Sequence, residues 1–126
     1  MSETKLSKAI RDALKLDPDV ECIRVNSGTI RKGSRFIHMA KSGTADLLLC
    51  VRVDVDDDGR WAQVKTEGRF AALEVKTPGG KTSKAREAKQ GEFLQRIRDL
   101  GGFGARVASV DEAREAVARC KSGENQ

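Results

Sequence analysis

The chain has 126 residues, a formal net charge of +5 and a hydrophobic fraction of 38%. This length suits one domain, and the composition supports a packed core, which excludes a mainly disordered chain. The longest apolar run, residues 45–53, is interrupted by Asp46 and Arg52 and is much shorter than the roughly 20 residues of a membrane span.

A helix followed by strands is predicted for the first half of the chain. Ser2 is a suitable N-cap, and apolar residues recur at helical spacing from Leu6 to Leu14 before Asp17-Pro18 ends the helix. Glu3 lies three and seven positions before Leu6 and Ile10, which places it at the N-terminal edge of the apolar face. Short extended segments are then expected at 20–25 and 35–39, with a turn at 26–28, and a strand buried on both faces at 47–51.

Two strand-like segments, two helices and one more strand are predicted for the second half. Gln90 shares the apolar stripe of the first of these helices, so a polar amide is expected on a buried face. The last helix begins with the capping-box spacing of Ser109 and Glu112. The predicted ranges are strands at 61–64 and 70–76 with a loop or bulge at 66–68, a helix at 83–100 with the stripe Phe93, Leu94, Ile97 and Leu100, a strand at 105–108 and a helix after Ser109.

This order of elements predicts a single α/β domain over residues 1–120, with one mixed β-sheet flanked by helices, and a frayed tail at 121–126. The first residues lack the apolar stretch of a secretory signal. The three cysteines, Cys22, Cys50 and Cys120, form no CxxC pair, and His38 is the one histidine. A reduced, cytoplasmic setting without disulfides or a zinc knuckle is therefore expected.

An acidic run resembles the first half of a calcium loop. Residues 54–59 match the first six positions of an EF-hand, including the glycine, but the twelfth position is Lys65 where a glutamate is required. The flanking segments are also strand-like rather than helical. We therefore interpret this run as a solvated hairpin turn.

Four polar residues form the more informative pattern. Glu74 and Lys76 are two apart in a strand and so project to the same side. An isolated pair of this kind is most often an ion pair. Here, however, Asp46 opens a buried strand and Gln90 lies on a buried helix face, and buried polar groups require partners. We expect these four residues to converge at one edge of the sheet.

These residues, in this order, resemble the virus-type replication-repair nuclease (VRR-NUC) domain of the PD-(D/E)XK nuclease superfamily. The resemblance runs through the segments 3–10, 26–28, 42–48, 73–83, 90–94 and 101–102 and so covers nearly the whole chain. One position departs from the family pattern, because Ala45 stands where proline is usual before the aspartate. Losing proline keeps the carboxylate but removes a restraint on the loop.

The resemblance implies a restriction-endonuclease-like core in the order α-β-β-β-α-β and a site for Mg²⁺ or Mn²⁺. Its ligands would be Asp46, Glu74 and the backbone carbonyl of Val75, with Glu3 as a further candidate ligand. Lys76 would orient the attacking water, and Gln90 would position the lysine or the water. Candidates for contacts to DNA phosphates are Lys81, Lys84, Arg86 and Lys89, whose alternative interpretation is a solvated helix face.

The activity implied is that of a metal-dependent, structure-selective DNA endonuclease of DNA repair. Single-domain members resemble phage-encoded resolvases, so we expect a homodimer that cuts four-way (Holliday) junctions. Apolar residues without an obvious covering helix could supply the dimer contact, although the same segment could instead join the sheet: Ile30, Phe36, Ile37 and Met39. The alternatives are a catalytically inert nucleic-acid-binding module on the same fold and a calcium-binding or protein-interaction domain.

Overall fold

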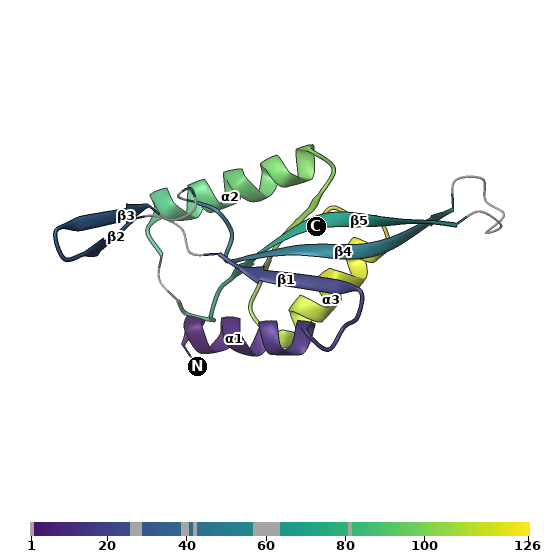
Figure 1. The fold of residues 1–126 in the computed structure, drawn as a ribbon, viewed down its shortest axis with the longest axis horizontal. Helices are drawn as coiled ribbons and strands as arrows, with labels where there is room; N and C mark the ends of the chain where they lie inside the picture. The colour runs from purple at the N-terminus through teal and green to yellow at the C-terminus, as the bar shows by residue number, and fades with distance from the viewer. Residues whose placement is uncertain (1, 26–28, 39–40, 42, 57–63, 81) are drawn as a thin grey trace.

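The computed structural model describes residues 2–25, 29–38, 41, 43–56, 64–80 and 82–126, with the backbone alone for 29–31 and 36–38. The predicted order of helix, strands, helix, strand and helix is confirmed, as is the mixed α/β class (Figure 1). The elements are α1 (Glu3–Leu14), β1 (Val20–Arg24), β2 (Thr29–Lys32), β3 (Arg35–His38), β4 (Leu47–Asp56), β5 (Val64–Val75), α2 (Lys84–Asp99), β6 (Phe103–Val107) and α3 (Val110–Lys121).

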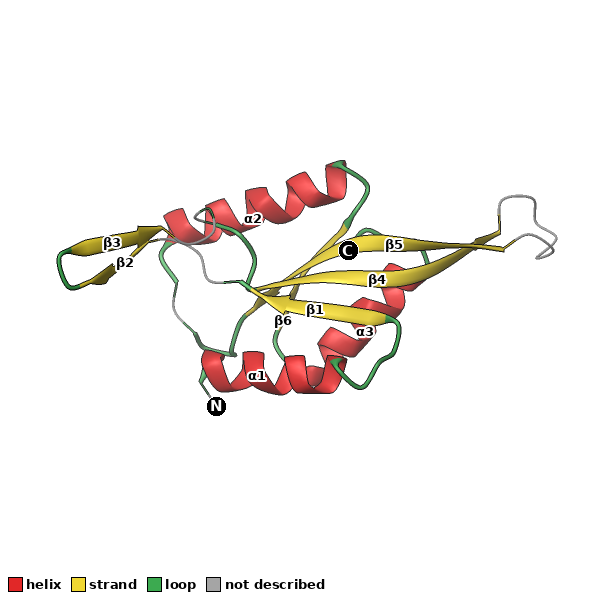
Figure 2. Ribbon diagram, viewed as in Figure 1, coloured by secondary structure: helices red, strands yellow, loops and turns green. Residues whose placement is uncertain are grey.

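A four-stranded mixed sheet forms the centre of the protein, in the order β1-β4-β5-β6. β4 pairs antiparallel with β1 and β5, whereas β6 runs parallel to β5. Helices α1 and α3 cover one face of this sheet and α2 covers the other, as Figure 2 shows. The connection from β5 to β6 passes through α2, which is the usual way for a chain to join parallel strands.

The two faces of the sheet differ in how they are packed. Alternate residues of β4, such as Leu47, Leu49 and Val51, face α1 and α3 and belong to the main core. The face toward α2 holds a smaller apolar cluster around Ala45, Ala72 and Leu94. The thin packing on the α2 side leaves room there for polar side chains.

Side chains that cap the backbone begin all three helices. The Ser2 hydroxyl accepts a hydrogen bond from the Lys5 N–H (3.2 Å), as expected, and Ser83 does the same for α2. The predicted capping box of α3 is confirmed, because Ser109 Oγ accepts from the Glu112 N–H (3.0 Å) while the Glu112 carboxylate accepts from the Ala108 N–H (3.2 Å).

Two details of the predicted second half are wrong. The loop or bulge expected at 66–68 is absent from the described residues, because β5 continues through Gly68, which pairs with Arg52. Glycine suits this strand position since a Cβ there would lie 2.8 Å from Cys50 Sγ. Leu100 was expected on the apolar stripe of α2 but is 65% exposed, because it lies past the end of the helix. Residues 61–63 of the predicted strand lie outside the described residues.

Residues 29–38 form a hairpin of their own. Strands β2 and β3 pair with each other, and the described residues show no contact between them and any other helix or strand. Residues 35–38 are extended, as expected, and form β3. Strand β2 was not predicted, and the alternative that this segment joins the main sheet is wrong. Gly33 allows the tight turn through its positive φ of 64°. The turn expected at 26–28, and Met39, lie outside the described residues.

The acidic run is flanked by two antiparallel strands, β4 and β5, as a hairpin requires and an EF-hand does not. The run is outside the described residues from Asp57 onward. Beyond residue 51, β4 no longer pairs with β1, so β4 and β5 continue as a two-stranded ribbon away from the sheet (Figure 1).

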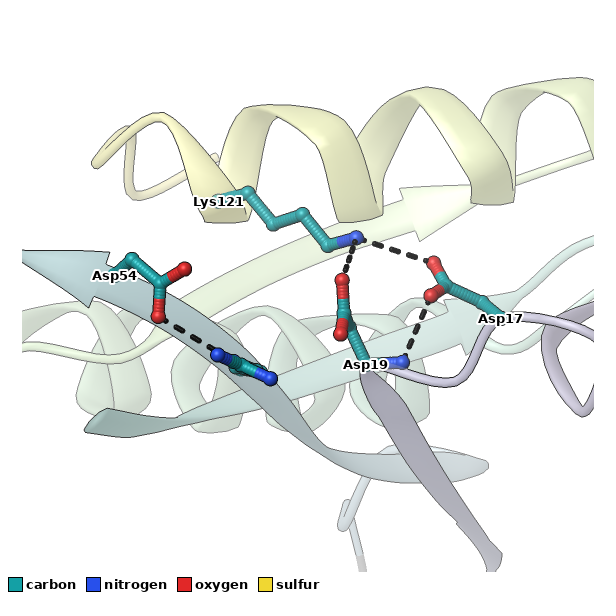
Figure 3. A network of polar contacts seen from close by, with 5 residues as sticks. Asp17, Asp19, Asp54 and Lys121 are labelled. Atoms are coloured by element: carbon teal, nitrogen blue, oxygen red, sulfur yellow. Dashed lines mark hydrogen bonds and ion pairs between the residues drawn. The ribbon is translucent and has the colours of Figure 1, made fainter. Parts of the chain in front are cut away.

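The C-terminal end of α3 is tied to the turn between α1 and β1. Lys121 Nζ contacts the carboxylates of Asp17 (3.3 Å) and Asp19 (3.1 Å), as Figure 3 shows. Residues after α3, where fraying was expected, also make hydrogen bonds. The Asn125 carbonyl accepts from the Gly104 N–H (3.0 Å), and the Arg69 guanidinium donates to the Glu124 carbonyl.

Candidate active site

The register of β4 and β5 places two carboxylates opposite each other. Leu47 pairs with Leu73, so Asp46 and Glu74 occupy the next position along the ladder. Asp46 Oδ2 accepts a hydrogen bond from the Val75 N–H (2.8 Å), and the Asp46 carbonyl accepts one from the Val25 N–H (2.8 Å). Asp46 is therefore fixed where the ends of β1, β4 and β5 meet.

Glu74 is the most deeply buried carboxylate among the described residues, with 1% of its surface exposed. Its Oε1 accepts a hydrogen bond from Gln90 Nε2 (2.7 Å) and lies 3.9 Å from Lys76 Nζ. The expectation that Gln90 is buried and that Asp46, Glu74, Lys76 and Gln90 converge at one end of the sheet is thus met in the structure. Glu74 Oε2 and Gln90 Oε1 are buried without a hydrogen-bond partner among the described residues.

Burial has a large effect on the acidity of Glu74. Desolvation, the negative charge of Asp46 and a hydrogen bond between the two carboxyls together raise the pKa of Glu74 from 4.5 to about 8. The Lys76 ammonium opposes this shift, and Glu3 contributes to it. Without a cation beyond Lys76, Glu74 therefore holds a proton near neutral pH.

Lys76 is held with its ammonium beside the carboxylates. Its Nζ donates to Thr82 Oγ1 (3.0 Å), and its side chain is 22% exposed, so the ammonium is reachable from solvent. The loop that supplies Thr82 begins with a turn in which the Gly80 N–H bonds the Thr77 carbonyl (2.9 Å) and Gly79 has a φ of 78°. The sequence analysis did not single out Thr82; its hydroxyl, six residues after the lysine, was the available signal.

The loop before Asp46 is restrained by contact with α2. Gly43 has a φ of 89°, and a Cβ there would lie 3.0 Å from Lys89 Cβ and 3.1 Å from the Lys89 carbonyl oxygen. Glycine is thus needed both for the backbone conformation and for the close approach. This packing restrains the loop that leads to Asp46.

A cavity of about 100 Å³ adjoins Asp46. Glu3 lines it, as do Arg24 at the end of β1 and the hydroxyl residues Thr4 and Ser7 of α1. The structure therefore places Glu3 near the two carboxylates. Arg24 was not predicted; the end of a strand next to the expected 26–28 turn was the signal for it.

The predicted phosphate-binding residues are not bonded to this cluster. Lys84, Arg86 and Lys89 are exposed on α2, and no hydrogen bond joins their side chains to the four site residues. Lys81 lies outside the described residues. Of the three, Lys89 is the nearest along the chain to the site, because it precedes Gln90.

The site suits a divalent cation in its chemistry, although it is small. No group of three or more His, Cys, Asp or Glu side chains in the described ranges is arranged to hold a metal ion. Asp46 and Glu74 nevertheless lie within reach of each other, and the buried Oε2 of Glu74 has no hydrogen-bond partner among the described residues, so a cation could take the place of the proton that Glu74 holds. A hard cation would take oxygen ligands from the two carboxylates, a backbone carbonyl and water.

No protein-family model matches the chain, and no curated protein matches it either. Among the described residues, no helix has the length and apolar character needed to cross a membrane.

Proposed function

We propose that the protein is a metal-dependent DNA nuclease with a PD-(D/E)XK core of the VRR-NUC type. The observation that carries the proposal is the buried Glu74 carboxyl next to the half-buried Asp46 and the Lys76 ammonium, with one Glu74 oxygen that has no hydrogen-bond partner among the described residues. A purely structural ion pair does not need a second carboxylate at this point. Placing a second carboxylate beside a buried one costs free energy of folding, and such a cost is typical of functional sites.

The residues that would hold Mg²⁺ or Mn²⁺ are Asp46, Glu74 and the backbone carbonyl of Val75, with Glu3 as a further, water-mediated ligand. Such an ion, when bound, lowers the pKa of water and offsets charge on a phosphoryl oxygen. The Asp46 carboxylate is already oriented by the Val75 N–H, and Glu74 by Gln90. These bonds limit the rearrangement that ligation requires.

Lys76 would act on the attacking water and on the developing charge. In hydrolysis the water oxygen bonds to phosphorus, one ester P–O bond breaks, and a proton passes to the leaving oxygen. An ammonium 3.9 Å from Glu74 Oε1, partly open to solvent, is placed to donate a hydrogen bond to the water or to a phosphoryl oxygen. Thr82 and Glu74 fix the position of the Lys76 ammonium, so this group is oriented before a substrate binds.

The substrate we propose is DNA, which matches the net charge of +5. A domain with one such site makes one cut, so paired cuts at a four-way junction require two copies related by a two-fold axis. A homodimeric junction-resolving nuclease is therefore the specific form of the proposal. An inert binding module on the same fold is the alternative; it requires no ordered Lys76 and no buried Glu74.

The test is cleavage of labelled linear, flapped and four-way DNA with Mg²⁺, Mn²⁺, Ca²⁺ or a chelator. We expect cuts with Mg²⁺ or Mn²⁺, none with the chelator, and binding without turnover with Ca²⁺, whose loose coordination misplaces the water. Lys76→Ala and Glu74→Ala should each abolish cleavage and retain most DNA affinity, since phosphate contacts are spread over the surface. Lys8→Ala, an exposed lysine on α1, is the matched control.

Two outcomes would contradict the proposal. Cleavage by Lys76→Ala at the wild-type rate refutes the mechanism. Metal-independent binding without any cleavage, by a protein that keeps its wild-type melting temperature, favours the inert module.

A further inference from the structure

A second concavity lies beside the proposed active site. It has a volume of about 510 Å³ and lies between α2 and residue 41 of the segment that leads into β4. We call it the α2 groove, and its lining residues are Lys41, Lys89, Glu92, Phe93 and Arg96. Its size falls in the range of pockets that hold small organic molecules, and a single nucleotide fits that range.

The charges of the α2 groove are available for a ligand. The lining holds three cations, Lys41, Lys89 and Arg96, and one carboxylate, Glu92. Glu92 is three residues from Lys89 and four from Arg96, which are the spacings of helical ion pairs, yet none of these side chains makes an ion pair or hydrogen bond with the described residues. The groove thus carries an excess of unpaired positive charge, which suits phosphate.

Phe93 gives the α2 groove an apolar wall. Its ring is partly buried and packs against the cluster of Ala45, Ala72 and Leu94, so it is anchored while one side lines the groove. Aromatic rings next to cations are the usual combination in proteins that bind unpaired nucleotides, because a base stacks on the ring while its phosphate meets the cation.

The α2 groove is connected to the active site along both of its walls. Lys89 precedes Gln90, which binds Glu74, and Gly43 contacts Lys89 three residues before Asp46. A strand whose nucleotide lies in the groove would therefore pass its neighbouring phosphates toward the two carboxylates. A duplex would meet only the rim, because a paired base cannot enter a concavity of this size.

We propose that the α2 groove binds one unpaired nucleotide of a DNA strand next to the scissile phosphate. Lys41, Lys89 and Arg96 contact its phosphates, and Phe93 stacks on its base. This rests on the proposed nuclease function and defines its substrate class as DNA with unpaired nucleotides near the cut, such as a flap, an overhang or an opened junction.

The test measures binding by fluorescence anisotropy in a chelator, so that cleavage plays no part. The probes are a labelled 12-nucleotide single strand, a duplex with a single-stranded overhang and a blunt duplex. Arg96→Gln and Lys89→Gln should each weaken binding of the single strand about 3- to 10-fold and reduce its salt slope by about 0.7. Glu92→Gln should strengthen it, which loss of folding cannot do.

The aromatic wall is tested separately. Phe93→Leu should weaken binding of the single strand and the overhang about 5-fold or more and leave the blunt duplex unchanged. Arg114→Gln is the control for charge, because this exposed arginine lies on α3, on the opposite face of the sheet. Melting temperatures identify any variant that has lost its fold. If one has, the affinity of Glu92→Gln for the single strand decides whether the groove binds phosphate.

The outcomes separate this inference from the nuclease function. If the groove variants bind the single strand with wild-type affinity, or lose as much affinity for the blunt duplex, the proposed role of the α2 groove is refuted. Selective losses in a protein that cleaves nothing with any metal ion support the groove and refute the nuclease. Cleavage of flapped DNA that is unaffected by Phe93→Leu and Arg96→Gln refutes the groove and retains the nuclease.

Discussion

Replacing Glu74 with glutamine should stabilise the metal-free protein and abolish the proposed DNA cleavage. Glutamine keeps the shape of the side chain, so its oxygen still accepts from Gln90 Nε2. Its new amide can donate to Gln90 Oε1, which is buried without a partner. The variant thus removes a buried acid and satisfies a polar atom without opening a cavity.

The size of the effect follows from the shifted acidity of Glu74. In the unfolded chain this carboxyl ionises near its ordinary pKa of 4.5, whereas in the folded protein burial, together with the neighbouring Asp46, raises the pKa to about 8. Folding therefore takes up a proton between these two values, and the free energy of unfolding falls as pH rises, by up to about 1.4 kcal/mol per pH unit. The penalty is absent below the lower pKa and complete above the higher one.

The assay is thermal unfolding of wild type and Glu74→Gln in a chelator from pH 5 to pH 8. The two proteins should differ least at pH 5, and by pH 7 the variant should be favoured by an additional 2–3 kcal/mol or so, which corresponds to on the order of 10 °C for a domain of this size. Saturating Mg²⁺ should remove most of the pH dependence of wild type, because a bound cation replaces the proton.

Two results would refute this reasoning. A gap between the two proteins that does not widen with pH would mean that Glu74 is ionised in the metal-free fold. A variant less stable than wild type throughout the range would mean that the Glu74 charge is already compensated, and the demand for a cation would then disappear.

Other predictions follow from the same geometry. Asp46→Asn should remove most of the rise in melting temperature that millimolar Mn²⁺ gives the wild type, since a ligand that binds only the folded state stabilises it; no rise in wild type would count against a preformed site. Gly43→Ala should cost about 1–3 kcal/mol by chemical denaturation and lower cleavage, because it strains the backbone and collides with Lys89; an unchanged midpoint would contradict this. Arg69→Met should increase amide exchange of residues 122–126, since Arg69 bonds the Cys120 and Glu124 carbonyls; unaltered exchange would show that the arginine does not hold the tail. Light scattering should give twice the chain mass of 13.7 kDa at micromolar protein, and a mass near 13.7 kDa would exclude the dimer.

Local chemistry made much of the fold predictable. Ser2, Ser109 and Glu112 act on backbone groups within four residues, so their capping roles could be inferred from spacing alone. The long apolar run of β4 likewise has one reasonable interpretation. Gly68 was misread as a loop residue because its reason for being small is Cys50, which lies on the neighbouring strand.

Part of the candidate site was predictable because polar residues stood where apolar ones belong. Gln90 on a buried stripe and Asp46 at the start of a buried strand each indicated a polar partner; Gln90 donates to Glu74, and Asp46 accepts from the Val75 N–H. Thr82 and Arg24 could not be found in this way, because they lie in segments where polar residues are expected. The α2 groove also could not be predicted from the sequence, because it depends on how residue 41 lies against α2.

The pairing of β4 with β5 also acts as a check on correct folding. Because successive strand residues alternate between faces, a slip of one position would turn Asp46 and Glu74 to opposite sides of the sheet. The same slip would expose Leu47, Leu49 and Val51 to the wrong side and empty the main core. The convergence of Asp46 with Glu74 and the filling of the main core therefore depend on one strand alignment, and a chain with a shifted register would achieve neither.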